Sequence, residues 1–206
     1  MAFIISADDI KKTLPGYNPK RSDVLHHKSA RLADKAYEDA LKTRPEKTAI
    51  LMSGGTASGK TEYISAFLRG RKAIIFDGTL PSFEGAKIKI RKALKHGKKI
   101  EIHAVLPLSI ETAFVAFLNR DRKFPPEHFY RTHSYSRKTL LEIALKFPEI
   151  PMEVVFSENI KKNGKYKMIF TRLSLSNRGM LVDFLSENQY TEEDIKRMQG
   201  LYLYDI

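Results

Sequence analysis

Short apolar runs alternate with amphipathic stretches along most of the chain. Mostly apolar runs of strand length lie at 48–52, 73–76, 100–106 and 152–156. The run 73–76 is uninterrupted, which is typical of a strand buried on both faces, as in a parallel sheet. Between and around these runs, apolar residues recur at helical spacing, which predicts helices at 22–42, 60–69, 82–97, 109–118 and 127–146. The alternation predicts βαβ units with right-handed crossovers and a mostly parallel sheet.

The first residues break this alternation. Residues 1–21 contain Pro15-Gly16 and Pro19, and we expect them to form an extended arm or a small entry element. At 206 residues the chain is long enough for one domain with a full core. We therefore expect a single domain over 1–206, with an N-terminal arm at 1–21, a core at 22–160 and a C-terminal addition at 161–206.

The C-terminal pattern also differs from that of the core. The run 165–173 predicts a strand, and the shorter apolar run 181–185 is a further candidate strand. Lys162-Asn163-Gly164-Lys165 is a hairpin-turn signal, with a loop as the alternative. Thr191, followed by two glutamates and an aspartate, has the form of a capped helix start. These signals predict a small addition of a β-hairpin and a helix.

Residues 54–61 match the phosphate-loop pattern G-x-x-x-x-G-K-[ST] at every fixed position. The glycines let successive backbone N–H groups turn toward phosphate oxygens, and the helix that follows directs its positive end at them. Lys60 would reach the outer phosphates, and the Thr61 hydroxyl would hold Mg²⁺. The expected nucleotide-binding residues are Gly54, Gly55, Thr56, Ala57, Ser58, Gly59, Lys60 and Thr61. The expected fold class is an α/β P-loop NTPase three-layer sandwich, and the expected ligands are ATP or GTP with Mg²⁺.

Asp77 follows the strand that comes after the phosphate-loop helix. Ligands of open α/β sheets bind outside the carboxyl ends of the strands, so a carboxylate there can hold the Mg²⁺ shell or accept a proton from an attacking hydroxyl. The alternative is an aspartate that only shapes the Asp77-Gly78 turn. Thr79 can hydrogen-bond a phosphate or an acceptor, or be an ordinary loop threonine.

Arg120 and Arg122 lie in a polar loop beyond the next strand and helix. Phosphoryl transfer needs cations that neutralise the moving γ-phosphoryl group, and the planar guanidinium binds two phosphate oxygens. The alternative is a pair of surface arginines at a helix C-terminus. His133, within the following helix, is expected to be structural rather than catalytic, because no histidine spacing resembles a metal site.

Composition indicates the class of protein and its location but not its substrate. The chain is 42% hydrophobic and 29% charged, which fits a globular protein, and it has no cysteine, no secretory signal and no apolar run of membrane-spanning length. We expect a cytoplasmic protein without membrane contact. The net charge is +12, and 87–99 holds seven Lys or Arg residues with no acidic residue. That segment is either the solvated face of a helix, which the absence of interleaved aromatic residues favours, or a surface for nucleic acid or acidic partners.

Together these motifs resemble the zeta-toxin group of phosphate-loop kinases. The resemblance runs from about His26 to Asn159 and rests on Gly54–Thr61, on Asp77-Gly-Thr-Leu80 and on Arg120-Asp-Arg122. It implies ATP- or GTP-dependent phosphorylation of a hydroxyl, with a UDP-linked amino sugar as acceptor and an antitoxin as protein partner. By position it implies phosphate and Mg²⁺ roles for Lys60 and Thr61, substrate roles for Asp77 and Thr79, and transition-state roles for Arg120 and Arg122.

The chain departs from the group in one respect. Such toxins carry a further strand, ending in a base aspartate, between the phosphate-loop helix and the acidic-Gly-Thr strand, and the segment before Asp77 is too short to hold it. Either Asp77 is the base, or the base is absent. The leading hypothesis is a zeta-toxin-like kinase. The alternatives are a nucleotide-dependent binding or switch protein that uses 87–99 on nucleic acid or a protein, and a kinase of another metabolite or of nucleic-acid ends.

Overall fold

A six-stranded sheet forms the centre of the molecule. The computed structural model describes residues 1–162 and 165–200. The strand order is β1-β3-β2-β4-β5-β6, parallel from β1 to β5, with β6 antiparallel to β5 at the edge. The strands are β1 (Phe3–Ser6), β2 (Thr48–Ser53), β3 (Ala73–Asp77), β4 (Lys99–Pro107), β5 (Met152–Lys162) and β6 (Lys165–Arg172). Because the five parallel strands end at the same edge, the residues that follow them converge there.

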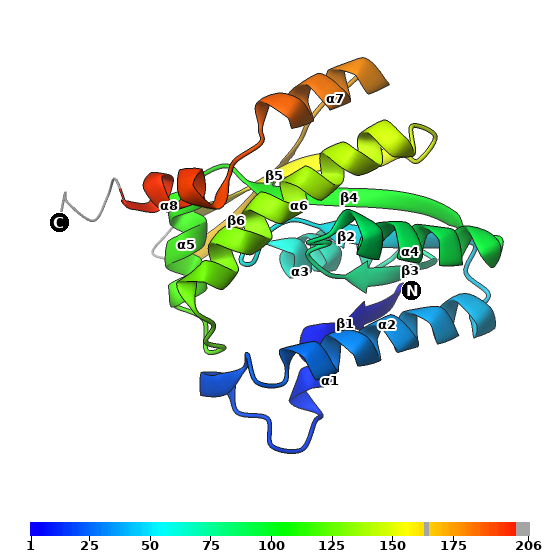
Figure 1. The fold of residues 1–206 in the computed structure, drawn as a ribbon, viewed down its shortest axis with the longest axis horizontal. Coiled ribbons are helices and arrows are strands. Elements are labelled where there is room, and N and C mark those ends of the chain that lie inside the picture. The colour runs from blue at the N-terminus through cyan, green and yellow to red at the C-terminus, as the bar shows by residue number, and fades with distance from the viewer. Residues whose placement is uncertain (163–164, 201–206) are drawn as a thin grey trace.

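Helices cover both faces of this sheet (Figure 1). One face is covered by α2, α4, α6 and α7, and the other by α3 with the π-helical turn η2 that continues it. The short α1 and η1 follow β1, and α5 and α8 pack against α6. The bounds are α1 (Ala7–Lys12), η1 (Pro19–Arg21), α2 (His26–Thr43), α3 (Lys60–Tyr63), η2 (Ile64–Leu68), α4 (Phe83–Lys95), α5 (Ile110–Leu118), α6 (Pro126–Lys146), α7 (Arg178–Glu187) and α8 (Glu192–Gly200). The expected fold class, a mostly parallel three-layer α/β sandwich with a C-terminal strand and helices, is confirmed.

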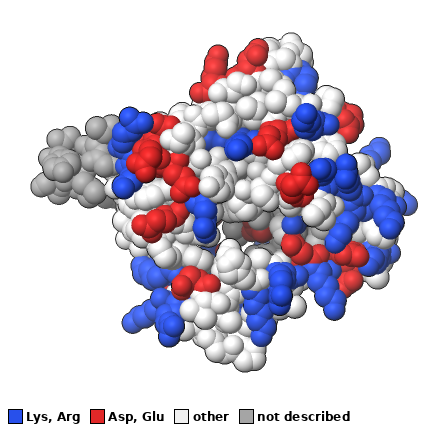
Figure 2. Space-filling model, in the orientation of Figure 1, with Lys and Arg blue, Asp and Glu red and all other residues white. Residues whose placement is uncertain are grey.

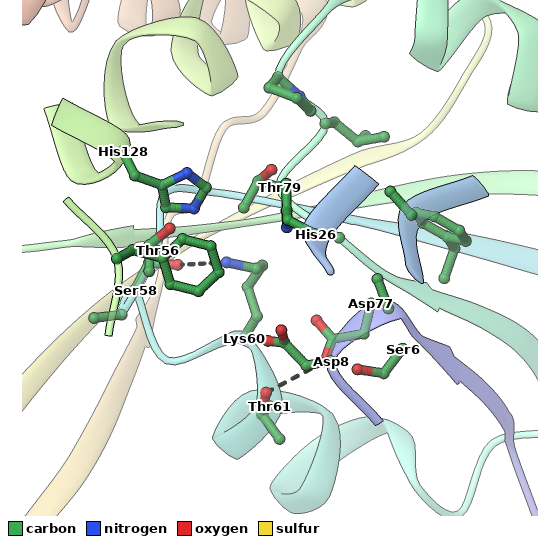
Figure 3. Close-up of a pocket in the computed structure, with 18 of the residues that line it drawn as sticks. Ser6, Asp8, His26, Thr56, Ser58, Lys60, Thr61, Asp77, Thr79 and His128 are labelled. Atoms are coloured by element: carbon green, nitrogen blue, oxygen red, sulfur yellow. Dashed lines mark hydrogen bonds between the residues drawn. The ribbon is translucent and has the colours of Figure 1, made fainter. Parts of the chain in front are cut away.

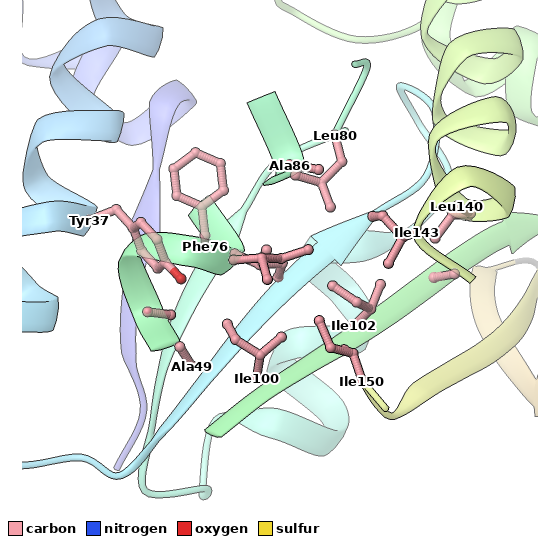
Figure 4. Packing of buried hydrophobic residues seen from close by; sticks show 14 of the residues in the cluster. Tyr37, Ala49, Phe76, Leu80, Ala86, Ile100, Ile102, Leu140, Ile143 and Ile150 are labelled. Atoms are coloured by element: carbon pink, nitrogen blue, oxygen red, sulfur yellow. The ribbon is translucent and has the colours of Figure 1, made fainter. Parts of the chain in front are cut away.

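The larger core lies between the sheet and the layer of α2, α4 and α6 (Figure 4). Tyr37 of α2 packs edge-on against Phe76 of β3, with ring centroids 5.4 Å apart. Ile102 of β4 and Ile143 of α6 have no exposed surface in the same cluster. Each fully buried side chain of this size contributes roughly 1.5–3 kcal/mol. This packing holds the carboxyl ends of β2, β3 and β4 in a fixed relation, and the candidate site is built on them.

Side-chain caps place the helix starts where the sequence has Ser, Thr or Asn. The Ser82 hydroxyl accepts from Gly85 N at the start of α4, and Ser109 accepts from Thr112 N at the start of α5. Thr191 and Asp194 form a reciprocal capping box before α8, with Asp194 N donating to Thr191 Oγ1 and Thr191 N donating to Asp194 Oδ2. The predicted helix start at Thr191 is therefore confirmed.

One predicted element is wrong. The run 181–185 is part of helix α7 rather than a strand, because Asn177 caps the helix start and Leu181 and Leu185, one helical turn apart, are buried in the core. Of the two alternatives for the first residues, the structure has a small element, since Phe3–Ser6 is edge strand β1, paired in parallel with β3. The expected turn at Asn163-Gly164 lies outside the described residues. No helix in the described part of the chain is both long and apolar enough to span a bilayer.

Candidate functional site

The loop between β2 and α3 has the backbone conformation that its glycines allow. Gly54 has φ +130° and Gly59 has φ +84°, a region that favours glycine. At Gly54 a Cβ atom would lie 2.1 Å from the carbonyl oxygen of Val105 on β4, so any larger residue would push the loop off the sheet. The loop consequently curls over the carboxyl ends of β2 and β4, before the first turn of α3.

Lys60 folds back over this loop. Its Nζ donates to the carbonyl oxygens of Gly54 at 2.9 Å and Gly55 at 2.7 Å. The side chain is almost fully buried, and this burial lowers the pKa of Lys60 to about 8. The ammonium thus lies inside the loop on the carbonyls, from which it can turn to phosphate oxygens that enter the cavity.

Helix α6 supports the loop from behind. His133 Nε2 donates to the Thr56 carbonyl at 2.8 Å, and Thr132 Oγ1 accepts from Thr56 N at 3.1 Å. From β5, the Ser157 hydroxyl donates to the Ser58 carbonyl at 2.7 Å. The sequence analysis expected a structural role for His133 but did not identify this contact, because the histidine is 77 residues from its partner.

Asp77 lies where β3 ends, opposite the start of α3. The Thr61 hydroxyl donates to Asp77 Oδ2 at 3.2 Å, which joins the two predicted Mg²⁺ ligands directly. Burial raises the pKa of Asp77, although nearby Lys60 opposes the shift. Mg²⁺ binds oxygen ligands, commonly one or two protein side chains together with substrate phosphates, so this hydroxyl–carboxylate pair fits the ion. Thr79 lines the same cavity, and its carbonyl accepts from the Ser53 hydroxyl at 3.4 Å.

Arg120 and Arg122 reach this cavity from the loop between α5 and α6. Arg120 forms no ion pair with any residue of 1–162 or 165–200, and burial lowers the pKa of its guanidinium. Arg122 is different, since it forms an ion pair with Asp8 in the first turn of α1. The two arginines are therefore in different electrostatic surroundings.

The N-terminal segment supplies one wall of the cavity that sequence reasoning missed. Ser6 and Asp8 line it, and Figure 3 shows Asp8 beside Asp77 and Lys60. His26, Phe124 and His128 also line the cavity, and Phe124 and His128 stack with centroids 4.4 Å apart. A clue was present in the sequence: Phe3-Ile4-Ile5 is an apolar triplet that runs into Ser6-Ala7-Asp8, the same order as the strand that ends at Asp77.

The cavity extends from the phosphate loop to two helices. Its volume is about 330 Å³. Loop residues 56–61 line it, as do residues of α2 and α4, among them Asp34 and Lys89. The structure thus brings Lys60, Thr61, Asp77, Thr79, Arg120 and Arg122 to one cavity.

The basic segment 87–99 is largely engaged within the protein. Lys89 pairs with Asp34 at 2.7 Å, and Lys92 pairs with Glu38 at 2.6 Å. Lys98 Nζ donates to two backbone carbonyls at the end of α2, and Lys87 pairs with Glu84. Figure 2 shows acidic side chains among the basic ones on the face in view. The structure favours a solvated helix face over a nucleic-acid surface.

Comparison with known proteins yields a loose structural likeness only. No protein-family profile matches the chain, and no curated protein matches it. Among solved structures, the native AvrRxo1-ORF1:-ORF2 complex aligns at TM-score 0.46 and 13% identity, over 90% of this chain and 86% of that chain. The same complex with sulphate ions gives 0.45 and 14%, over 92% and 86%, and with ATP 0.43 and 13%, over 90% and 91%. At these TM-scores the likeness has no weight for function.

Proposed function

We propose that this protein is a phosphotransferase that binds ATP or GTP with Mg²⁺ and passes the γ-phosphoryl group to a hydroxyl acceptor. The observation that carries the proposal is the Thr61–Asp77 hydrogen bond beside Lys60, in a cavity that extends from the phosphate loop to α2 and α4. The resemblance to zeta-toxin kinases, drawn from the sequence, points to the same reaction.

The loop would bind the phosphates of the nucleotide. Residues 54–61 offer backbone N–H groups and the start of α3, and Lys60 would exchange the Gly54 and Gly55 carbonyls for phosphate oxygens. Thr61 and Asp77 would hold Mg²⁺, which neutralises charge on the β- and γ-phosphates when bound. The His133 and Ser157 contacts behind the loop keep it in this shape before the nucleotide arrives.

Transfer would take place in the cavity, beside the phosphate loop. The acceptor oxygen forms a bond to the γ-phosphorus as the bond from that phosphorus to the β–γ bridging oxygen breaks, leaving the nucleoside diphosphate. The acceptor proton passes to the Asp77 carboxylate or, if Asp77 only holds the ion, to solvent. Arg120 and Arg122 line the cavity and would neutralise the transferred group, and Thr79 would be a hydrogen-bonding group for the acceptor. Following the resemblance, the acceptor is a UDP-linked amino sugar, and an antitoxin protein is the expected inhibitor.

The test is incubation with γ-labelled ATP or GTP, Mg²⁺ and a panel of hydroxyl acceptors that includes UDP-linked amino sugars. We expect label on one acceptor class, and at least tenfold weaker nucleotide binding by Lys60→Ala, since charge-assisted hydrogen bonds contribute about 1.5–3 kcal/mol. Lys72→Ala, a change at an exposed lysine, is the matched control and should bind normally. Unchanged binding by Lys60→Ala would refute the nucleotide site, and binding without labelling of any acceptor would refute the transferase.

A further inference from the structure

The loop between α5 and α6, residues 119–125, carries Arg120 and Arg122 and is called the arginine loop below. It contacts the N-terminal part of the chain at several points. Asp8 of α1 pairs with Arg122, and the N–H of Lys123 donates to the Pro19 carbonyl at 2.9 Å. The Lys11 ammonium lies 4.7 Å from the centroid of the Phe124 ring. His26, at the start of α2, meets the same ring edge-on. Three consecutive loop residues thus contact a part of the chain that is about a hundred residues away in sequence.

Asp8 owes its place to strand β1. The register pairs Ser6 of β1 with Asp77 of β3, so that the residues after both strands emerge at the same edge of the sheet. The Ser6 hydroxyl then accepts from Asp9 N and begins α1, which puts Asp8 in the first turn. The short helix turns the carboxylate toward the cavity, beside Asp77 (Figure 3).

Asp8 is itself held by a buried lysine. Lys11 has no exposed surface, and its Nζ donates to Asp8 Oδ1 at 3.3 Å and to the Ser22 hydroxyl at 3.4 Å. Burial alone would raise the pKa of Asp8, but Arg122 and Lys11 outweigh it and hold that pKa below its usual range. A carboxylate between two cations is a poor proton acceptor and a good anchor. The Asp8 carboxylate is therefore suited to hold a guanidinium in place rather than to accept a proton in catalysis.

The ion pair with Asp8 gives Arg122 a different role from that of Arg120. Arg122 has its charge matched by Asp8, whereas Arg120, two residues earlier in the same loop, has no such partner in 1–162 or 165–200. Arg120 faces a cavity that also holds Lys60 and Asp77. Fixing Arg122 therefore fixes the loop that presents the uncompensated guanidinium of Arg120 to the phosphate end of the cavity.

We propose that Asp8 is a positioning residue: through its ion pair with Arg122 it holds the arginine loop, and with it Arg120, against the phosphate-binding end of the cavity. The proposal rests on the proposed phosphotransferase function and adds Asp8, in the first turn of the short helix after β1, to its machinery. Arg122 is then the anchored residue of the loop, and Arg120 is the one that meets the transferred phosphoryl group.

The test compares Asp8→Asn with Asp9→Asn in the full chain. Asp9 is an exposed neighbour whose one ion pair within 1–162 and 165–200 is with Lys12, so its variant should match the wild type. For Asp8→Asn we expect kcat to fall at least tenfold while KM for the nucleotide changes less than threefold, and amide exchange in 119–125 to quicken. Asp8→Glu should recover part of kcat. A purely structural role would change thermal unfolding without this split between kcat and KM.

A double-mutant cycle tests whether Asp8 acts through its ion pair with Arg122. Arg122→Gln should lower kcat about as much as Asp8→Asn, and the double variant should be no worse than either, because both remove the same ion pair. If Asp8→Asn does not fold, Arg122→Gln replaces it in the test, because it removes the same ion pair from the side of the loop. Multiplied effects in the double variant, or an unchanged kcat in Asp8→Asn with unchanged exchange in 119–125, would overturn the proposal. A wild type that transfers no phosphate would instead overturn the proposed function.

Discussion

His133 and Gly55 meet closely behind the phosphate loop. The histidine donates to the Thr56 carbonyl, and its ring lies so near Gly55 that a Cβ atom there would come within 2.2 Å of the ring. Phe129 packs on the ring, with centroids 4.1 Å apart. The imidazole has no free side into which it could move, so Gly55 is required by packing as well as by the phosphate-loop pattern.

Replacing Gly55 by alanine should therefore be destabilising. We expect Gly55→Ala to lower the free energy of unfolding by about 1–3 kcal/mol, as overpacking in a filled interior does. Nucleotide affinity should fall as well, because the loop must shift away from α6. Urea denaturation and nucleotide titration measure the two effects. Gly70→Ala is the control, since a Cβ there would meet nothing within 4 Å, and equal stability of the two variants would contradict the packing argument.

The same histidine makes stability depend on pH. Burial, reinforced by the positive charges of Arg137, Lys60 and Arg120, holds the pKa of His133 well below its usual value. Above pH 6.5 neither the folded nor the unfolded chain protonates this ring, whereas below it only the unfolded chain does, so unfolding becomes more favourable as pH falls. From pH 7.5 to 5.5 this single group should remove about 1.4 kcal/mol.

Urea denaturation at both pH values measures that loss. In His133→Gln the amide can still donate to the Thr56 carbonyl but does not titrate. This variant should lose about 1.4 kcal/mol less than the wild type over the same interval. Other histidines contribute to both proteins alike, as burial also lowers the pKa of His128, to about 4. Identical losses in the two proteins would show that His133 is not the group concerned.

At the scale of elements, one arginine caps the C-terminal end of α6. Arg178, the first residue of α7, donates from Nε and Nη2 to the Ala144 carbonyl, at 2.9 and 2.7 Å. It also donates to the carbonyls of Phe147 at 2.9 Å and Ile150 at 3.1 Å. Carbonyls at a helix C-terminus lack partners within the helix, and a cation there suits the helix dipole. Helix α6, which supports the phosphate loop, is thereby tied to the C-terminal addition.

Removing this cap should weaken the whole domain. We expect Arg178→Met to lower the free energy of unfolding by about 2 kcal/mol, because hydrogen bonds from a charged group contribute about 1.5–3 kcal/mol and carbonyls are left without partners. Urea denaturation tests this. Arg197→Met removes an exposed arginine that forms an ion pair with Asp194, its neighbour on α8, and should change stability by less than about 0.5 kcal/mol. A loss of that small size in Arg178→Met would count against the cap.

Elements were predictable from the sequence where their determinants are local. The phosphate loop, the strand that ends at Asp77 and the helix start at Thr191 are each specified by a few consecutive residues. Strand β1 has only a weak local signal, the apolar triplet Phe3-Ile4-Ile5, because four residues carry little pattern and their partner β3 lies far along the chain. Part of helix α7 has the pattern of a strand, since the short apolar run from Leu181 to Leu185 fits both the strand period and the helix period. Only packing in the folded protein distinguishes the two. The Asp8–Arg122 pair depends on both distant segments and so has no local signature.

At the scale of the whole molecule, the cavity lies between several layers of structure. Its walls come from β1, α2, β3, α4 and the arginine loop as well as from the phosphate loop. A ligand in it would contact segments from the first residues to about residue 128. Binding should consequently stabilise the domain as a unit rather than only the loop.

Thermal unfolding gives a direct measure of that coupling. With Mg²⁺ and nucleotide at about 100 times Kd, the folded state gains about 2.7 kcal/mol, which for a domain of this size raises Tm by roughly 5–10 °C. Lys60→Ala should show little of this shift at the same nucleotide concentration, and Lys72→Ala should show all of it. A full shift in Lys60→Ala would place the nucleotide elsewhere.

The pairing of β1 with β3 has a consequence for how the chain is made. During synthesis Phe3–Ser6 leaves the ribosome before its partner Ile74–Asp77, which follows about 70 residues later, a wait of roughly 4–14 s at 5–20 residues per second. Asp8 meets Arg122 only after still more of the chain has emerged. A product that stops before β3 leaves β1 without its partner strand, and one that stops between residues 61 and 120 has the phosphate loop but lacks Arg120 and Arg122.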